Sequence, residues 1–309
     1  MAKRPQRVAY AEALIDLAAQ NDKVVVLDAD LAHATQTQKF KDVYPDRFYD
    51  FGIAEADMIC AAAGMAHTGL MPFAHTFSLF GTGRAYEPIR NTIAYVNANV
   101  KIALTHNGLC VGEDGGSHQS VEDINLMRCV PNMTILCPCD CTEVRKAVFA
   151  AAEIDGPVYI RIIRTPVEDV TDENTEFVVG KAVKLADGDD VCIMATGTMV
   201  KVAMDAAEML KAKGISAAVV DHHTIKPIDK EMILEMNSKC KAIVTVEEHS
   251  IIGGLGSAVA EVIAGVPGAK FDRIGINDKF GKSGKPEDLY KAYHLTAEDV
   301  ADRCVEALK

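Results

Sequence analysis

A polar, glycine-rich segment directly follows one of the apolar runs of the sequence. The run VKIALTH ends at His106, and the chain continues as NGLCVGEDGGSHQSVED. His106, His118 and Asp114 lie here among several glycines, which allow the backbone to approach a ligand closely. Because imidazoles donate hydrogen bonds and move protons near neutral pH, we interpret the segment as a candidate site for a polar substrate. A solvated turn with capping acids is the alternative, and the irregular His/Asp spacing disfavours a helical zinc motif.

Glu55 is the second candidate for proton chemistry. It lies in the run FGIAEADMICAAAGMA, whose other residues are mostly small and apolar. A carboxylate at the start of such a helix is expected to be partly desolvated and therefore suited to sharing a proton. An acid that simply favours the first helical turn, because of the helix dipole, is the alternative and the better explanation of this residue alone.

Aromatic and acidic side chains add two weaker candidates. Phe77 and Phe80 lie three residues apart in AHTFSLF and could form a stacking wall, although core packing is the commoner role of two phenylalanines. Asp30 ends the apolar run KVVVLDADL. Ligands of open α/β sheets bind at the carboxyl ends of strands, so this position is a candidate contact.

Arginines and cysteines are the last candidates for binding a ligand or a metal. Arg161 and Arg164 end the run PVYIRIIR and could bind a phosphate in fork geometry, or pair with a surface acid. Cys137, Cys139 and Cys141 could bind a soft metal, but no second ligand pair follows at suitable spacing. We therefore expect no metal ligand in this chain.

Apolar runs typical of buried strands alternate with helical patterns, and these elements must position the candidates. In the first half, strands or extended segments are expected at 23–31, 73–80, 100–106, 133–138 and 157–163, and helices at 8–18, 54–67, 84–96 and 142–153. In the second half, strands are expected at 190–197, 216–221 and 241–248, and helices at 204–213, 229–236 and from Thr296, with Asp299 as its capping partner. Because strand–helix alternation implies a parallel sheet covered on both faces, the fold class is α/β with two open α/β domains.

Length and composition agree with two domains and exclude several classes of protein. The 309 residues are 49% hydrophobic, and the polar, acidic stretch TPVEDVTDENTEF interrupts the alternation. We therefore expect domains at 1–168 and 181–309, joined by a linker at 169–180. A net charge of −12 without a basic cluster argues against nucleic-acid binding, and no apolar run approaches the ~20 residues that cross a bilayer. Nine cysteines, mostly in apolar surroundings, indicate a reducing, cytoplasmic location.

Taken together and in order, these segments resemble the C-terminal half of transketolases. The matching motifs are FGIAEADM, TFSLF and THNGLCVGEDGGSHQSVED, and HTIKPID and VTVEEHSIIGGLGSAVAE extend the resemblance to nearly the whole chain. The resemblance implies a pyrimidine-binding domain with a largely parallel sheet, followed by a transketolase C-terminal domain. It also implies thiamine diphosphate as the cofactor and transfer of a two-carbon ketol unit between ketose and aldose sugar phosphates, as in the pentose phosphate pathway.

The resemblance assigns cofactor roles to four residues. Glu55 corresponds to the glutamate that hydrogen-bonds the aminopyrimidine ring and promotes its imino tautomer. Phe80, with Phe77 beside it, corresponds to the wall that stacks on the pyrimidine. Asp30 matches an acid near that ring.

Substrate roles follow from the same resemblance. His106, Asp114 and His118 match residues that contact the sugar hydroxyls and assist proton transfer, and Arg7 and Arg164 match the arginines that hold the substrate phosphate. The glutamate and the two histidines are thus the implied catalytic residues.

The chain departs from the family at two positions. Ala34, next to Thr35, stands where a serine often contacts the phosphate, so the terminal anion could be a phosphate or a sulfonate. Gly83 stands where an aromatic residue lies near the pyrimidine.

The family's Mg²⁺- and diphosphate-binding signature, GDG followed by an asparagine, is not found in this sequence. The resemblance is therefore to one subunit of a split transketolase. It implies an N-terminal partner subunit that supplies the Mg²⁺ ligands, self-association at a dimer interface, and a heterotetramer with two copies of each chain.

Three alternatives remain open. The β subunit of a 2-oxo acid dehydrogenase shares the domain order, and a deoxyxylulose-phosphate synthase has a similar glutamate motif. The segment GEDGGSHQ with its histidines favours sugar chemistry over the dehydrogenase. The third alternative, a non-catalytic assembly subunit, is disfavoured by the intact Glu55, His106 and His118.

Overall fold

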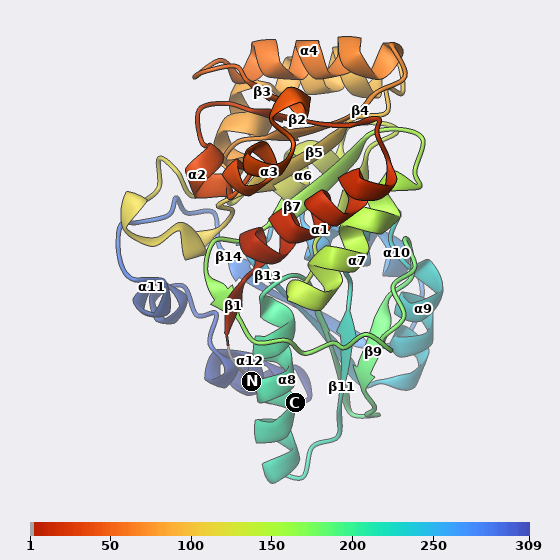
Figure 1. Ribbon diagram of the computed structural model, residues 1–309. Coiled ribbons are helices and arrows are strands. Elements are labelled where there is room, and N and C mark those ends of the chain that lie inside the picture. Colours follow the sequence, from red (N-terminus) through yellow and green to blue (C-terminus); the bar gives the residue numbers. More distant parts are fainter. Residues whose placement is uncertain (1–2) are drawn as a thin grey trace.

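A seven-stranded sheet forms the first domain, and the apolar runs of the sequence form its interior strands (Figure 1). This computed structural model describes residues 3–309. The strand order is β12-β6-β7-β5-β4-β2-β3, and only β12 runs antiparallel to its neighbour. The strands are β2 (Val24–Asp28), β3 (Phe48–Asp50), β4 (Met71–His75), β5 (Lys101–Thr105), β6 (Thr134–Leu136), β7 (Val158–Ile162) and β12 (Thr224–Lys226). Every residue of β2, β4, β5 and β7 is buried, as expected of parallel strands covered on both faces.

Helices cover both faces of this sheet. On one face α1 (Gln6–Gln20) and α7 (Cys141–Ala152) pack side by side, and on the other lie α4 (Glu55–His67) and the helical turns η2 (Phe80–Arg84) and η3 (Ile89–Ala94). The shorter elements are α2 (Ala32–Thr35), α3 (Gln38–Val43), η1 (Pro45–Arg47), α5 (Tyr86–Pro88), η4 (Leu109–Asp114) and α6 (Asp123–Arg128).

The second domain is a five-stranded sheet with the order β14-β13-β10-β11-β9, in which only β9 is antiparallel. Its strands are β9 (Val183–Ala186), β10 (Val191–Ala195), β11 (Ala217–Asp221), β13 (Ala242–Ser250) and β14 (Lys270–Ile276). Its helices are α8 (Met199–Ala212), α9 (Lys230–Lys239), α10 (Leu255–Ile263), α11 (Pro286–Ala292) and α12 (Ala297–Ala307). The predicted capping pair of Thr296 and Asp299 is confirmed at the start of α12. Both domains are thus open α/β layers, as the sequence predicted.

The two domains pack into one unit. Strand β12 belongs to the second half of the chain, yet it pairs with β6 of the first sheet. One hydrophobic cluster also runs through both domains and includes Met58 and Ile135 of the first and Met236 and Leu255 of the second. Figure 1 shows the result, with α4 at one end of the molecule and α8 at the other.

Residues 169–180 contain no helix or strand, but they are held in place. The Asp140 carboxylate accepts hydrogen bonds from the backbone N–H groups of Val170 at 2.8 Å and Thr171 at 2.7 Å. Just before this stretch, β8 (Pro166–Val167) pairs with β1 (Arg4–Pro5). The domain boundaries proposed from the sequence remain a prediction.

One local expectation was wrong, and one helix differs in type. The chain leaves β4 at His75 and is already helical at Ser78, so it is not extended as far as Phe80. The stretch predicted as a helix at 84–96 is helical from Tyr86 to Ala94, but α5 is flanked by wide π-helical turns. Pro88 lies in this stretch, and its missing N–H removes one regular helical hydrogen bond.

No helix within residues 3–309 combines the length and the apolar character needed to cross a membrane.

Candidate active site

Three neighbouring strands bring distant residues to one edge of the first sheet. Phe77 follows β4, His106 follows β5 and Arg164 follows β7, and these strands lie side by side in the order β4-β5-β7. Because they are parallel, their carboxyl ends meet at the same edge. The sequence-predicted residues therefore converge although up to 87 positions separate them along the chain.

Aromatic rings form the centre of the site. Phe77 stacks on His106 with ring centroids 3.9 Å apart and on Phe80 at 5.7 Å. His118 lies edge-on to Phe80 at 5.3 Å. The two phenylalanines therefore contact both candidate histidines and form with them a continuous surface for a flat ring or a sugar.

His106 is held in an unusual environment. Its backbone φ is +60°, in the left-handed region, and the residue is 3% exposed. Burial, followed by the positive charges of Arg7 and Arg164, lowers the pKa of His106 to about 3. The imidazole is therefore neutral at physiological pH, with its Nδ1 2.8 Å from the Thr105 hydroxyl.

Glu55 begins α4 and is joined to the aromatic cluster through Arg84. The glutamate is 5% exposed, and its Oε1 accepts a hydrogen bond from Arg84 Nη1 at 2.8 Å. The same guanidinium lies over the Phe80 ring, 4.2 Å from its centroid. Sequence reasoning missed Arg84; its only sequence signal is a position one helical turn after Phe80.

Two arginines near His106 give the site positive charge. Arg7, on α1, donates from Nη1 to the carbonyl of Ala34 at 2.7 Å, and its buried Nε has no partner within residues 3–309. Burial and the charge of Arg164 lower the pKa of Arg7. Arg164 contacts the Val111 carbonyl at 2.5 Å and Asp114 at 3.5 Å. This pair suits an anionic group.

Asp30 follows β2, the strand beside β4, and its role near the cofactor stays a prediction. It is exposed, and its backbone N–H donates to the Asp50 carboxylate at 3.1 Å. Sequence reasoning missed the neighbouring Asp28, which is fully buried at the end of β2 and has its pKa raised to about 6 by burial. The Thr35 hydroxyl donates to Asp28 at 2.9 Å, so Thr35 is already engaged and does not take the place of the serine missing at Ala34.

Arg161 pairs with an acid, but with a buried one and not with the surface acid that the sequence suggested. Its Nε donates to Asp123 at 2.7 Å, with both side chains buried, and its Nη2 donates to the Glu248 carbonyl at 3.0 Å. It links the two domains and does not face a ligand.

The three clustered cysteines do not form a thiolate set. Among residues 3–309, the one group of three potential metal-ligand atoms within 4.8 Å of one another joins Cys139 to Glu143 and Asp221. Burial and nearby acids raise the pKa values of Cys139 and Asp221 well above their usual range. The group is one buried thiol and two buried carboxyls, and we assign it no metal.

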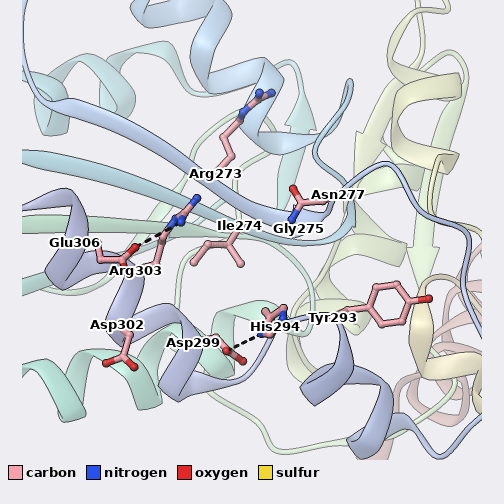
Figure 2. Close-up of a pocket in the computed structure, with 10 residues that line it drawn as sticks. All are labelled: Arg273, Ile274, Gly275, Asn277, Tyr293, His294, Asp299, Asp302, Arg303 and Glu306. Atoms are coloured by element: carbon pink, nitrogen blue, oxygen red, sulfur yellow. Dashed lines mark hydrogen bonds and ion pairs between the residues drawn. The ribbon is translucent and has the colours of Figure 1, made fainter.

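A separate hollow of about 340 Å³ lies entirely on the second domain, between β14 and α12 (Figure 2). Two side-chain pairs lie in it: His294 is 3.3 Å from Asp299, and Arg303 is 3.5 Å from Glu306, although Arg303 lies closer to Asp272, at 2.6 Å. None of the predicted site residues lines it, so we do not assign it to the active site.

Two family models match the chain. The transketolase pyrimidine-binding domain matches residues 3–168, and the transketolase C-terminal domain matches residues 180–300.

Similar proteins extend over nearly the whole length. A transketolase C-terminal section of Methanocaldococcus jannaschii is 49% identical over 306 residues, which cover 98% of this chain and 96% of that protein. A 6-deoxy-6-sulfo-D-fructose transketolase subunit of Clostridium sp. (strain MSTE9) is 41% identical over 95% of this chain and 91% of its own. A solved structure described as a split gene transketolase, inactive beta4 tetramer, is 47% identical with a TM-score of 0.92 over 98% of both chains.

Proposed function

Because the chain belongs to the transketolase family, we propose that it is the pyrimidine-binding subunit of a two-subunit, thiamine-diphosphate-dependent transketolase. In this proposal the enzyme transfers a two-carbon ketol unit between sugars that carry a terminal anion. The observation that carries the proposal is one cluster, in which Phe77 and Phe80 join His106 and His118 between a buried carboxylate and a pair of arginines.

The residues present fit the aminopyrimidine part of thiamine diphosphate. Glu55 is buried, but its contact at Oε1 is with the half-exposed Arg84, and Phe80 offers an aromatic face beside it. A carboxylate next to an aromatic face suits a flat ring with hydrogen-bonding nitrogens. When bound, the cofactor supplies the electron sink for cleaving and forming carbon–carbon bonds. In our proposal Glu55 holds a proton against the ring, and Phe77 and Phe80 orient it.

The remaining residues act on the sugar. His106 is neutral and buried, so it can donate or accept a hydrogen bond at a sugar hydroxyl without first losing a proton. His118 and Asp114 lie on the same loop and complete the polar contacts in this proposal. Arg7 and Arg164 bind the terminal anion. Asp30 is exposed just after β2, and its contact with the ring stays a prediction from the family resemblance.

Mg²⁺ and the diphosphate would be held by an N-terminal partner subunit. The match to a transketolase C-terminal section and to a transketolase subunit supports this proposal. The similar split gene transketolase is described as an inactive β4 tetramer, which supports self-association of this chain without activity. The functional assembly would then be a heterotetramer in the cytoplasm.

The nature of the terminal anion is open to a direct test. The relative that is a 6-deoxy-6-sulfo-D-fructose transketolase subunit is 41% identical, so a sulfonate is as reasonable as a phosphate. Competition between the two donors at equal concentration would rank their kcat/KM values.

The decisive experiment combines the chain with its N-terminal partner. Ketol transfer is expected from the mixture with thiamine diphosphate and Mg²⁺, and full activity of the isolated chain would contradict the split-subunit proposal. Glu55→Ala should lower kcat by at least about 100-fold, the effect typical of removing a proton-transfer group. The control is Asp57→Ala, an exposed acid two positions along α4, which should retain activity. Near-normal turnover of Glu55→Ala would reject the role of that residue.

A further inference from the structure

Glu248 is a buried carboxylate of the second domain that contacts the glycine-rich loop of the first. It lies on β13 and is 2% exposed. Its Oε1 accepts a hydrogen bond from the backbone N–H of Cys110 at 2.7 Å. Cys110 lies between His106 and Asp114, so this contact is made to the loop that carries the proposed sugar-binding residues.

The Glu248 side chain is itself held in one position. Its Oε2 accepts hydrogen bonds from the hydroxyl of Thr198 at 2.8 Å and the hydroxyl of Tyr290 at 3.1 Å. Its backbone carbonyl accepts one from Arg161 at 3.0 Å. Because both carboxylate oxygens have partners, the side chain forms a fixed support for the loop.

The backbone beside His106 lies directly against this carboxylate. Gly108 has a φ of +67°, and a Cβ added to it would lie 2.5 Å from Glu248 Oε1. Only a residue without a side chain fits between the loop and the carboxylate in this conformation. The left-handed backbone of His106, two residues earlier, is thus part of a segment shaped against Glu248.

The outer side of the loop also contacts the second domain. The Ser283 hydroxyl donates to the Glu113 carbonyl at 2.6 Å, and the Gln119 amide donates to the Lys282 carbonyl at 2.9 Å. A Cβ at Gly116 would lie 2.7 Å from the Gly281 carbonyl oxygen. The loop is therefore clamped from both sides by a domain that contributes none of the predicted site residues.

We infer that Glu248 is a positioning residue for ketol transfer, which fixes His106 and the sugar-binding loop through the Cys110 amide. The inference rests on the proposed function. Glu248 acts through the loop backbone and touches none of the predicted site side chains, so its removal should weaken catalysis only as far as His106 and its loop lose their geometry.

The next residue along the strand provides a matched control. Glu247 is also fully buried, but its carboxylate accepts the N–H groups of Leu255 at 2.7 Å and Gly256 at 2.8 Å, at the start of α10. Adjacent residues of a strand face opposite sides, so Glu247 supports a helix and Glu248 supports the loop.

Hydrogen–deuterium exchange of the whole chain tests the contact without requiring activity. Glu248→Ala should speed exchange in residues 107–118 about tenfold, the size expected from losing one buried hydrogen bond. Glu247→Ala should do so only at the start of α10. Unchanged exchange in residues 107–118 of Glu248→Ala, or an equal increase there in Glu247→Ala, would overturn the inference.

Kinetics with the partner subunit test the consequence. Glu248→Ala should lower kcat/KM for the ketose donor about tenfold, whereas Glu247→Ala should lower it less than about threefold. Glu248→Gln should recover most of the loss, because its amide oxygen still accepts a hydrogen bond from the Cys110 N–H. In a His106→Ala background the further effect of Glu248→Ala should be small, since coupled residues are not additive. A full tenfold loss in that background, or none in the wild-type background, would overturn the inference.

Two results, an inactive wild-type complex and a Glu248→Ala variant that does not fold, are resolved by a further measurement or variant. An absence of ketol transfer by the wild-type complex would refute the proposed function, while the exchange measurement still decides whether Glu248 holds the loop. If Glu248→Ala does not fold, Tyr290→Phe removes one partner of the carboxylate and should give a smaller increase of exchange in the same segment. No increase there would overturn the inference.

Discussion

His106 shows how a single residue acquires its chemistry from its surroundings. A free imidazole titrates near pH 6.5, but burial among Phe77, Arg7 and Arg164 favours the uncharged form. The histidine is therefore a neutral hydrogen-bonding group in the folded protein, whereas the sequence by itself allowed a proton carrier that ionises near pH 7.

We predict that His106 remains neutral down to pH about 4. Its pKa of about 3 lies below the unfolded value, so protons bind preferentially to the unfolded chain, and this residue lowers stability as the pH falls from about 6.5 towards 3. Long-range ¹H–¹⁵N spectra of the labelled chain, assigned with His106→Asn, would show the neutral tautomer across this range. A titration midpoint near pH 6.5 would contradict the prediction.

Arg164 provides a second test at the residue scale. Replacing it by Gln should raise KM for an anionic donor by roughly 10- to 100-fold and leave kcat within about threefold, because a hydrogen bond to a charged group contributes ~1.5–3 kcal/mol to uniform binding. Arg145→Gln is the control, because this arginine pairs with Asp16 on the surface. An unchanged KM would reject the anion-binding role of Arg164.

At the scale of elements, buried polar side chains connect helices and loops whose contact cannot be read from the hydrophobic pattern of the sequence. Asp140 caps α7 by accepting the Glu143 N–H at 2.8 Å, and its other oxygen binds residues 170 and 171 of the interdomain segment. One buried carboxylate thus caps α7 and also binds the segment that connects the two domains.

Asp140→Ala should therefore cost more stability than the loss of an ordinary helix cap. A cap contributes ~0.5–2 kcal/mol, and each buried N–H left unpaired adds ~1–3 kcal/mol, so a loss of at least about 3 kcal/mol is expected in urea unfolding. Asp229→Ala is the matched control, since Asp229 caps α9 and binds one further amide, that of Ala182. Equal losses for the two variants would show that the two interdomain N–H bonds of Asp140 contribute no more than the single extra bond of Asp229.

At the scale of the whole molecule, the interface between the domains contains a buried pair of acids. Glu143 lies in the first turn of α7 of the first domain, and Asp221 ends β11 of the second. Both Asp221 oxygens and Glu143 Oε1 are buried without a hydrogen-bond donor among residues 3–309. Burial, and then the charge of Glu143, raise the pKa of Asp221 well above its usual range.

We predict that this pair makes the protein less stable as the pH rises. The native state keeps a proton that the unfolded chain releases above pH ~3.9, so stability decreases with increasing pH over the range where the pair still holds its proton. Asp221→Asn cannot ionise and can donate to Glu143, so it should be more stable than the wild type at pH 8 by about 1–3 kcal/mol.

Urea unfolding at pH 6, 7, 8 and 9 measures both variants, with Glu208→Gln on the exposed face of α8 as a control expected to follow the wild type. Parallel pH profiles for the wild type and Asp221→Asn would refute the shared proton.

Much of the fold followed from the sequence, because buried parallel strands are continuous apolar runs whose neighbours must be helices. This pattern predicted the positions of β2, β5, β7, β10, β11 and β13 along the chain and the two-domain α/β class. It predicted a helix around Pro88 but not its π-helical turns, and it did not predict β12, whose pairing with the first sheet depends on distant partners.

The sequence by itself determined which chemical groups the chain has and, through the ordered motifs, the family to which it belongs. Only the tertiary structure decided which groups meet: it joined Arg84 to Glu55, engaged Thr35 with Asp28, left Asp30 exposed and placed Glu248 beneath the glycine-rich loop. Periodicity reports the face on which a side chain lies, whereas desolvation, hydrogen bonding and charge depend on residues that lie far apart along the chain and are brought together by packing.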